Sequence, residues 1–188
     1  MASDVRARMI AGAARLLAQG GLHGTSFADV LELTGAPRGS LYHHFPGGKD
    51  ELIGAAIELV GSRSLDALEQ RAGAPPDEIA AHFLDMWRSL LSRSHLTAGC
   101  SVLAVTVASP SRVLLERTGE IFRTWRGRLA QLLEQGGLTA TEAARFAATL
   151  IAASEGAVVL SRAEQSMEPF ELVCEQLMDQ IRRIVSTR

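Results

Sequence analysis

Apolar residues recur every three or four positions along almost the whole chain, which places them on one face of successive α-helices. Clusters of glycine and proline interrupt this pattern and mark the expected helix ends. The main interruptions are Gly20-Gly21, Gly35-Ala36-Pro37, Pro46-Gly47-Gly48, Gly73-Ala74-Pro75-Pro76 and Gly136-Gly137. The pattern predicts an all-α protein of about nine helices.

Three helices are expected before residue 46, and a long fourth helix from about Lys49 to Arg71. Ser26 can cap the second helix, because Asp29 follows three residues later and completes a capping box. Three apolar residues of this helix are expected to face inward, namely Phe27, Val30 and Leu31. The third helix is expected from Arg38 to about Phe45, after a turn that contains glycine. This arrangement is the helix-turn-helix pattern.

The segment His95–Pro110 is ambiguous. Val102, Val105 and Val107 would suit a β-strand, but the chain offers no second strand to pair with it. We therefore expect a short buried helix here. Thr139 and Glu142 form another capping-box pattern, which predicts the start of a further helix.

Composition and charge narrow the class of protein. Hydrophobic residues make up 47% of the chain, which is enough for a packed core, and the formal net charge is −2. A nucleoid-packing protein would be far more basic. The longest uncharged stretch, His95–Ser111, is shorter than the ~20 apolar residues of a membrane span. We expect a cytoplasmic protein with no membrane partner, in which Cys100 and Cys174 are small buried hydrophobes.

The expected third helix has little apolar surface. Leu41 and Phe45, four residues apart, can pack inward. The outward face then offers a guanidinium, a hydroxyl, a phenol and two imidazoles, which are groups that bind base edges and phosphates. A plain polar surface helix is the alternative.

Lys49 is the only lysine of the chain, and it stands where a cation is disfavoured by the dipole of the fourth helix. A cation at this place is explained if a phosphate binds to the helix N-terminus. A solvated lysine paired with a nearby acid is the alternative.

Residues 25–53 resemble the DNA-binding region of the tetracycline-repressor (TetR) family. The resemblance rests on Thr25-Ser26, on the run Leu41-Tyr42-His43-His44-Phe45 and on Lys49. It implies that Thr25 and Ser26 touch the DNA backbone and that Tyr42, His44 and Lys49 hold phosphates. It further implies that Arg38, Gly39, Ser40 and His43 face the major groove. The implied protein is a ligand-responsive regulator, most simply a repressor that binds a palindromic operator.

One feature departs from the family pattern. Three residues, Pro46-Gly47-Gly48, separate Phe45 from Lys49, whereas many family members have one residue fewer between the phenylalanine and the lysine. Lys49 is therefore expected to be shifted relative to the DNA phosphates. Gly47-Gly48 and Gly99-Cys100 resemble the LmrA/YxaF-like subgroup, which governs multidrug-efflux and quinone- or flavonoid-responsive genes.

The last two expected helices suit a dimer interface. The last one repeats apolar residues at heptad-like spacing, from Phe170 to Val185, and the one before it is rich in small residues, such as Ala148, Ala152 and Gly156. Both stripes would equally suit the core of a single chain. The resemblance favours a homodimer built from a four-helix interface.

Bulky side chains in the middle of the chain can line a cavity for a small apolar or aromatic effector. The candidates are Phe83, Met86, Trp87, Cys100, Phe122 and Trp125. A filled core is the alternative. We therefore divide the chain into a helix-turn-helix DNA-binding domain, residues 1–50, and a helical-bundle domain for effector binding and dimerisation, residues 51–188.

The competing class is a small helical hydrolase or metal enzyme. The five histidines show no metal-ligand spacing, and the neighbouring His43 and His44 are expected to point to different sides of their helix. Ser154-Glu155-Gly156 is not a nucleophile elbow. We expect no enzyme activity, no cofactor and no metal.

Overall fold

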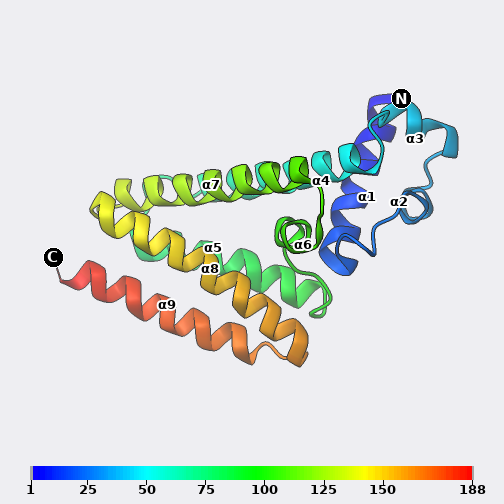
Figure 1. The fold of residues 1–188 in the computed structure, drawn as a ribbon. Coiled ribbons are helices and arrows are strands. Elements are labelled where there is room, and N and C mark those ends of the chain that lie inside the picture. Colours follow the sequence, from blue (N-terminus) through cyan, green and yellow to red (C-terminus); the bar gives the residue numbers. More distant parts are fainter. Residues whose placement is uncertain (1, 188) are drawn as a thin grey trace. The chain divides into compact units, whose positions relative to one another are not determined.

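The computed structural model describes residues 2–187, and the described chain forms nine helices and no strand, which confirms the all-α prediction. The helices are α1 (Ala2–Gly20), α2 (Phe27–Thr34), α3 (Arg38–His44), α4 (Lys49–Glu69), α5 (Pro76–Arg93), α6 (Ser101–Ala108), α7 (Arg112–Gln135), α8 (Ala140–Glu164) and α9 (Glu168–Ser186) (Figure 1).

The helices pack into two compact units. The N-terminal unit contains the residues up to Arg63 together with Cys100–Ile121, and the C-terminal unit contains Ser64–Gly99 and the residues from Phe122 onward. The N-terminal unit therefore holds α6 and the first part of α7 in addition to α1, α2, α3 and most of α4.

The core of the N-terminal unit is built around α1. Met9, Ala13 and Leu17 are completely buried, at the helical spacing of four residues. Helix α1 packs against α2 on one side and α6 on another. The hydroxyl of Ser101, the first residue of α6, donates a buried hydrogen bond of 3.1 Å to the carbonyl oxygen of Ala14. Segments far apart in the sequence thus form one small core.

The segment before α6 differs from the sequence-based prediction. The helix covers only Ser101–Ala108, whereas His95 and Leu96 have left-handed backbones with φ of 50° and 61°. The Leu96 N–H donates to the carbonyl of Leu91, which closes the end of α5. A left-handed helix end usually contains glycine, so two non-glycine residues gave no signal in the sequence.

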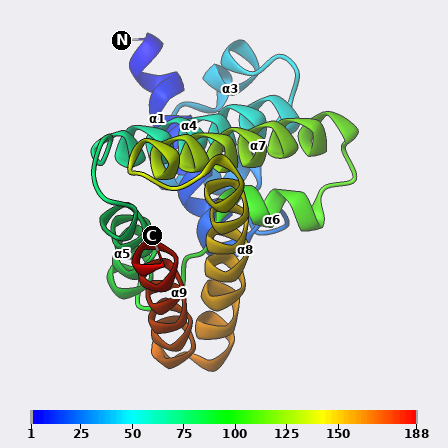
Figure 2. The same ribbon diagram turned by 90° about the vertical axis from the view of Figure 1, so that its left-hand side faces the viewer.

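The core of the C-terminal unit lies between α5, α8 and α9, which run side by side (Figure 2). The apolar stripe of α9 faces this core: Phe170, Cys174, Leu177 and Ile181 are all buried. Arg88 of α5 clamps Glu171 of α9 with two hydrogen bonds of 2.7 Å. The apolar face of α9, which the sequence left open as either a dimer interface or a core face, therefore packs largely into the core of its own chain.

By length and composition α8 would be able to cross a membrane, but this is weak support for a span. In its most apolar window, 44% of the helix is buried inside the protein. Ser154 and Glu155, in the middle of the helix, are among its buried residues. The packing of α8 against α5 and α9 is that of a core helix.

Candidate DNA interface

Helix α2 is fixed at both ends by local hydrogen bonds. The Ser26 N–H donates to the Asp29 carboxylate at 2.8 Å and the Asp29 N–H donates to the Ser26 hydroxyl at 3.2 Å, which confirms the predicted capping box. Hydrogen bonding by Ser26, with a smaller contribution from the charge of Lys49, lowers the pKa of Asp29. Gly35 ends α2 in the left-handed conformation, with φ of 63°.

Helix α3 is held by Leu41 and by Phe45, the residue that directly follows it, as predicted. Leu41 and Phe45 are 2% and 0% exposed, so they fix the rotation of a helix that is only seven residues long. Pro37 precedes the helix, and its carbonyl accepts a hydrogen bond of 2.6 Å from the hydroxyl of Ser40. The remaining residues of α3 are therefore turned outward in a defined orientation.

The outward face of α3 presents the polar groups that the sequence singled out. Arg38, Gly39, Tyr42 and His43 are exposed, and His44 is half-buried. Tyr42 is 73% exposed, which is unusual for so large an apolar ring. The neighbouring histidines differ in exposure, and their rings meet edge to face with centroids 5.1 Å apart.

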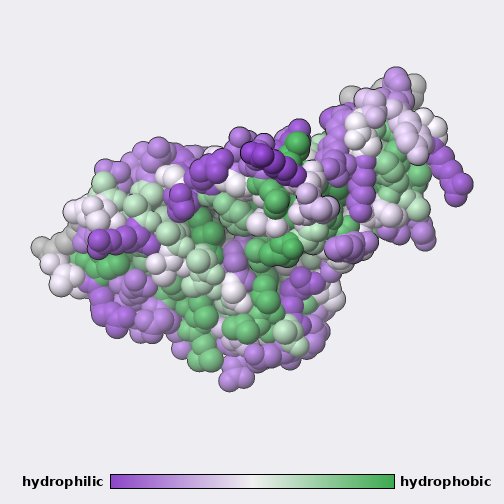
Figure 3. All heavy atoms as spheres, in the orientation of Figure 1, coloured by the Kyte–Doolittle hydropathy of each residue, from purple (hydrophilic) through white to green (hydrophobic). Residues whose placement is uncertain are grey.

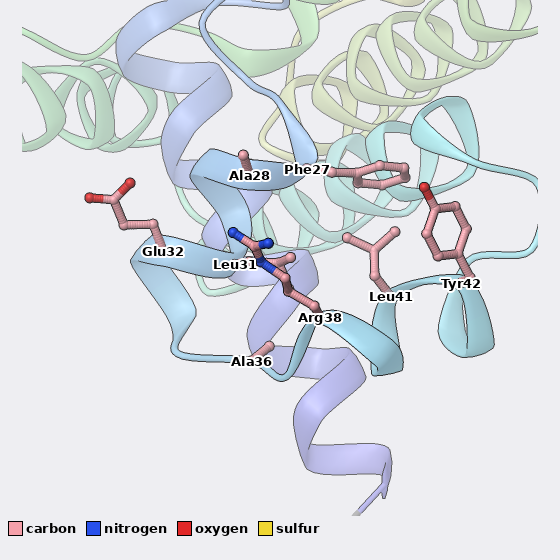
Figure 4. Close-up of a pocket in the computed structure, with 8 residues that line it drawn as sticks. All are labelled: Phe27, Ala28, Leu31, Glu32, Ala36, Arg38, Leu41 and Tyr42. Carbon is pink, nitrogen blue, oxygen red and sulfur yellow. The ribbon is translucent and has the colours of Figure 1, made fainter.

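An open groove of about 720 Å³ lies between α2 and α3 (Figure 4). It is lined by Phe27, Ala28, Leu31, Glu32, Ala36, Arg38, Leu41 and Tyr42. The prediction that Phe27, Val30 and Leu31 all face inward was therefore only partly right. Val30 is completely buried, whereas Phe27 and Leu31 are half-buried and line the groove. Sequence periodicity did not reveal this groove, since a half-exposed apolar residue has the same spacing as a core residue.

Thr25 and Lys49 are both engaged in hydrogen bonds inside the N-terminal unit. The Thr25 side chain is 1% exposed and its hydroxyl donates to the carbonyl of Gly21 at 2.8 Å. The Lys49 ammonium donates to the carbonyl of Leu22 at 3.0 Å and stays half-buried. The partner of Lys49 is a main-chain oxygen, which no side-chain pattern in the sequence could have indicated.

The connection from Phe45 to Lys49 forms a turn before α4. Gly48 takes a left-handed backbone with φ of 80°, which favours glycine. The carboxylate of Glu51 accepts a hydrogen bond of 2.8 Å from the N–H of Gly47. The chain thus makes a tight turn directly before Lys49.

Comparison with known proteins agrees with this geometry. The sequence model of the family "Bacterial regulatory proteins, tetR family" matches residues 9–56, and that of "Transcriptional regulator LmrA/YxaF-like, C-terminal domain" matches residues 76–176. The chain belongs to the TetR family of transcriptional regulators. An uncharacterized HTH-type transcriptional regulator of Mycobacterium tuberculosis H37Rv is 31% identical over 179 residues, covering 92% of this chain and 91% of the relative.

Two further relatives extend over nearly the whole chain. The HTH-type transcriptional regulator LmrA of Bacillus subtilis (strain 168) is 28% identical over 186 residues, or 96% of this chain and 98% of that protein. A TetR transcriptional regulator from Chloroflexus aurantiacus is 27% identical, with a TM-score of 0.79 and 96% of each chain covered. This TetR-family regulator is therefore a DNA-binding protein, and its helix-turn-helix is α2–turn–α3.

The residues predicted to bind an effector fall into three groups. Phe83, Met86 and Trp87 lie on α5, and Phe122 and Trp125 lie on α7 with their rings edge to face and centroids 5.5 Å apart. These five belong to the C-terminal unit. Cys100 belongs to the N-terminal unit, where its sulfur accepts a hydrogen bond from the Leu103 N–H and caps α6.

Proposed function

We propose that this TetR-family regulator is a cytoplasmic repressor that binds a palindromic operator as a homodimer and is released by a small apolar or aromatic effector. Residues 1–50 bind DNA in this proposal, and residues 51–188 bind the effector and dimerise. The observation that carries the DNA-binding role is the outward face of α3, anchored by Leu41 and Phe45 and exposing Arg38, Tyr42 and His43. Such a helix suits the major groove.

The DNA contacts divide into base-reading and phosphate-holding groups. Arg38, Gly39, Ser40 and His43 face the bases, and Arg38 is the group best suited to a bidentate bond with guanine. The phosphate-holding groups are Ser26, Tyr42, His44 and Lys49. Because the Thr25 hydroxyl is buried and occupied, we assign the contact of Thr25 to its main chain.

Random-sequence selection followed by a salt titration tests the DNA-binding role. We expect enrichment of a two-fold symmetric site and a steep loss of affinity with salt, because cations of the protein replace the counterions of the phosphates. No enriched sequence at any salt concentration would reject the proposal.

The dimer is proposed from an exposed apolar face in the C-terminal unit. Val159, Leu160 and Leu172 are 52%, 49% and 59% exposed, on α8 and α9. Figure 3 shows hydrophobic residues gathered on the face over these helices. The small residues Ala152 and Gly156 are also exposed on α8, so another helix can approach closely. Two copies of this surface form a self-complementary interface of the kind that two-fold symmetry requires.

The effector is proposed to contact the bulky side chains of α5 and α7 in the C-terminal unit. Trp125 is 5% exposed and Trp87 is half-buried. In a solid core, Trp→Ala at either place costs roughly 3–5 kcal/mol. Where the ring lines a cavity, we expect a smaller loss and an altered response to the ligand. Thermal unfolding of Trp87→Ala and Trp125→Ala, with a screen of apolar compounds for operator release, separates the two cases.

A further inference from the structure

Tyr42 is the only tyrosine of the chain, and burial does not hold its ring in place. The side chain is 73% exposed on α3. A free side chain with two rotatable bonds loses conformational entropy when it is fixed against a ligand, and this cost weakens binding. A contact that fixes the ring beforehand therefore strengthens binding without touching the ligand.

Phe27 makes such a contact. The Phe27 and Tyr42 rings meet edge to face, with centroids 6.3 Å apart and an angle of 70° between the ring planes. This is a favoured geometry for two aromatic rings. In Figure 4 the phenol of Tyr42 reaches back from α3 toward α2, and its hydroxyl end lies beside Phe27.

Phe27 itself is rigidly placed. It is the first residue of α2 and directly follows Ser26, which the capping box holds from both sides. Its side chain is half-buried and lines the groove between α2 and α3. A ring fixed to the start of one helix thus supports a ring that projects from the next.

We propose that Phe27 is a positioning residue for operator binding: its ring holds the phenol of Tyr42 beside the N-terminal end of α2, in the orientation in which Tyr42 binds a DNA phosphate. Phe27 acts through Tyr42 and has no contact of its own with a base. The inference rests on the proposed operator binding and adds a residue that sets its geometry.

The single tyrosine gives a direct test. Protein labelled with 3-fluorotyrosine has one ¹⁹F resonance, which reports the surroundings and mobility of the Tyr42 ring alone. We expect Phe27→Leu, which keeps an apolar side chain in the groove, to shift this resonance and narrow it toward that of a freely rotating ring. Leu33→Ala is the matched control, because Leu33 is 41% exposed on the same helix outside the groove, and it should leave the resonance unchanged.

A double-mutant cycle on the selected operator measures the coupling in binding. Phe27→Leu should weaken binding roughly three- to tenfold when Tyr42 is present, which is the range expected of an aromatic pair. In the Tyr42→Ala background the same change should have no further effect. Phe27→Tyr retains an aromatic edge and should restore most of the affinity; the fluorine spectrum is not used for this variant because it adds a second tyrosine.

Several outcomes would overturn the inference. Equal losses of affinity from Phe27→Leu in both backgrounds would show a general structural effect, and an unchanged ¹⁹F resonance would show that Phe27 does not fix the ring. If Phe27→Leu strongly lowers the melting temperature, the Phe27→Tyr variant is the deciding test. A folded Phe27→Tyr protein that does not regain affinity for the operator would reject the positioning role of Phe27. Failure of the wild-type protein to bind any selected DNA would instead reject the proposed function itself.

Discussion

The ammonium of Lys49 donates a hydrogen bond of 3.0 Å to the main-chain carbonyl of Leu22, which ties the start of α4 to the turn after α1. The charge of Lys49 also contributes to the lowered pKa of Asp29, the acidic partner of Ser26 in the capping box of α2. The bond to Leu22 gives the ammonium a partner in the first turn of a helix, where a cation is disfavoured. The ammonium has three N–H donors, so a bond to Leu22 leaves donors for a phosphate.

Lys49→Ala should weaken binding to all DNA sequences alike. Each phosphate contact that is lost should reduce the slope of log affinity against log salt by about 1, and a dimer loses two such contacts. Fluorescence anisotropy over a salt series measures the slope. Lys49→Arg keeps the charge and should keep the slope, whereas a wild-type slope in Lys49→Ala would show that Lys49 acts only on Leu22 and Asp29.

Arg38→Ala should relax the choice of base instead. Arg38 is exposed at the start of α3, and one good bidentate contact to guanine contributes roughly 1–3 kcal/mol of discrimination. Binding to a set of operators with single-base changes measures this loss. We expect the preference to disappear at one base pair of each half-site, and a uniform loss across all operators would reassign Arg38 to the phosphates.

Leu172→Glu should dissociate the proposed dimer without unfolding the chain. Leu172 is 59% exposed, so the glutamate is solvated in the monomer but would be desolvated in the interface. We expect the dissociation constant of the dimer to rise at least about 100-fold in sedimentation velocity. Val113→Glu, at a 57% exposed residue of the N-terminal unit, is the control and should remain dimeric.

The ion pair between Arg88 and Glu171 should make stability depend on pH. The Arg88 hydrogen bonds hold the pKa of Glu171 below its usual value of 4.5, so the pair stabilises the fold above that pH. This contribution is lost as the pH falls through the lowered pKa of Glu171. The reason is that the unfolded chain, in which Glu171 has its usual pKa, binds the proton more readily than the folded protein does. Since both side chains are more than a third exposed, solvent screening limits the effect to about 1 kcal/mol.

Glu171→Gln tests this dependence by chemical denaturation between pH 3 and pH 7. The variant should be less stable at pH 7, and the difference should shrink below about pH 4.5. Glu175→Gln, at an exposed residue of the same helix, serves as the control. A constant difference at all pH values would mean that packing rather than charge accounts for the loss.

Much of the fold could be predicted from the sequence because its signals are local. The Ser26–Asp29 capping box, the end of α2 at Gly35 and the inward pair Leu41 and Phe45 each depend on residues within four positions of one another. These same signals fixed the outward face of α3. Whether the proposed contacts to DNA and effector occur stays a prediction.

The remaining features depend on partners that are distant in sequence or carry no side-chain signal. The left-handed backbone at His95 and Leu96 could not be predicted, because neither residue is a glycine. The oxygen that binds Lys49 belongs to the main chain of Leu22, 27 residues away. The edge-to-face contact of Phe27 with Tyr42 crosses between two helices, and periodicity within one helix cannot reveal it.

The buried hydrogen bond from Ser101 to Ala14 bears on how such a regulator can be recombined. A chimera that takes only the first three helices and α4 would leave the α6-facing side of α1 without its own cover, and would leave the Ala14 carbonyl without this donor. The exchangeable module therefore consists of two pieces of chain, the residues up to Arg63 and Cys100–Ile121. Grafting both pieces together preserves the support of the DNA-binding helices, and a cut at a single point in the sequence does not.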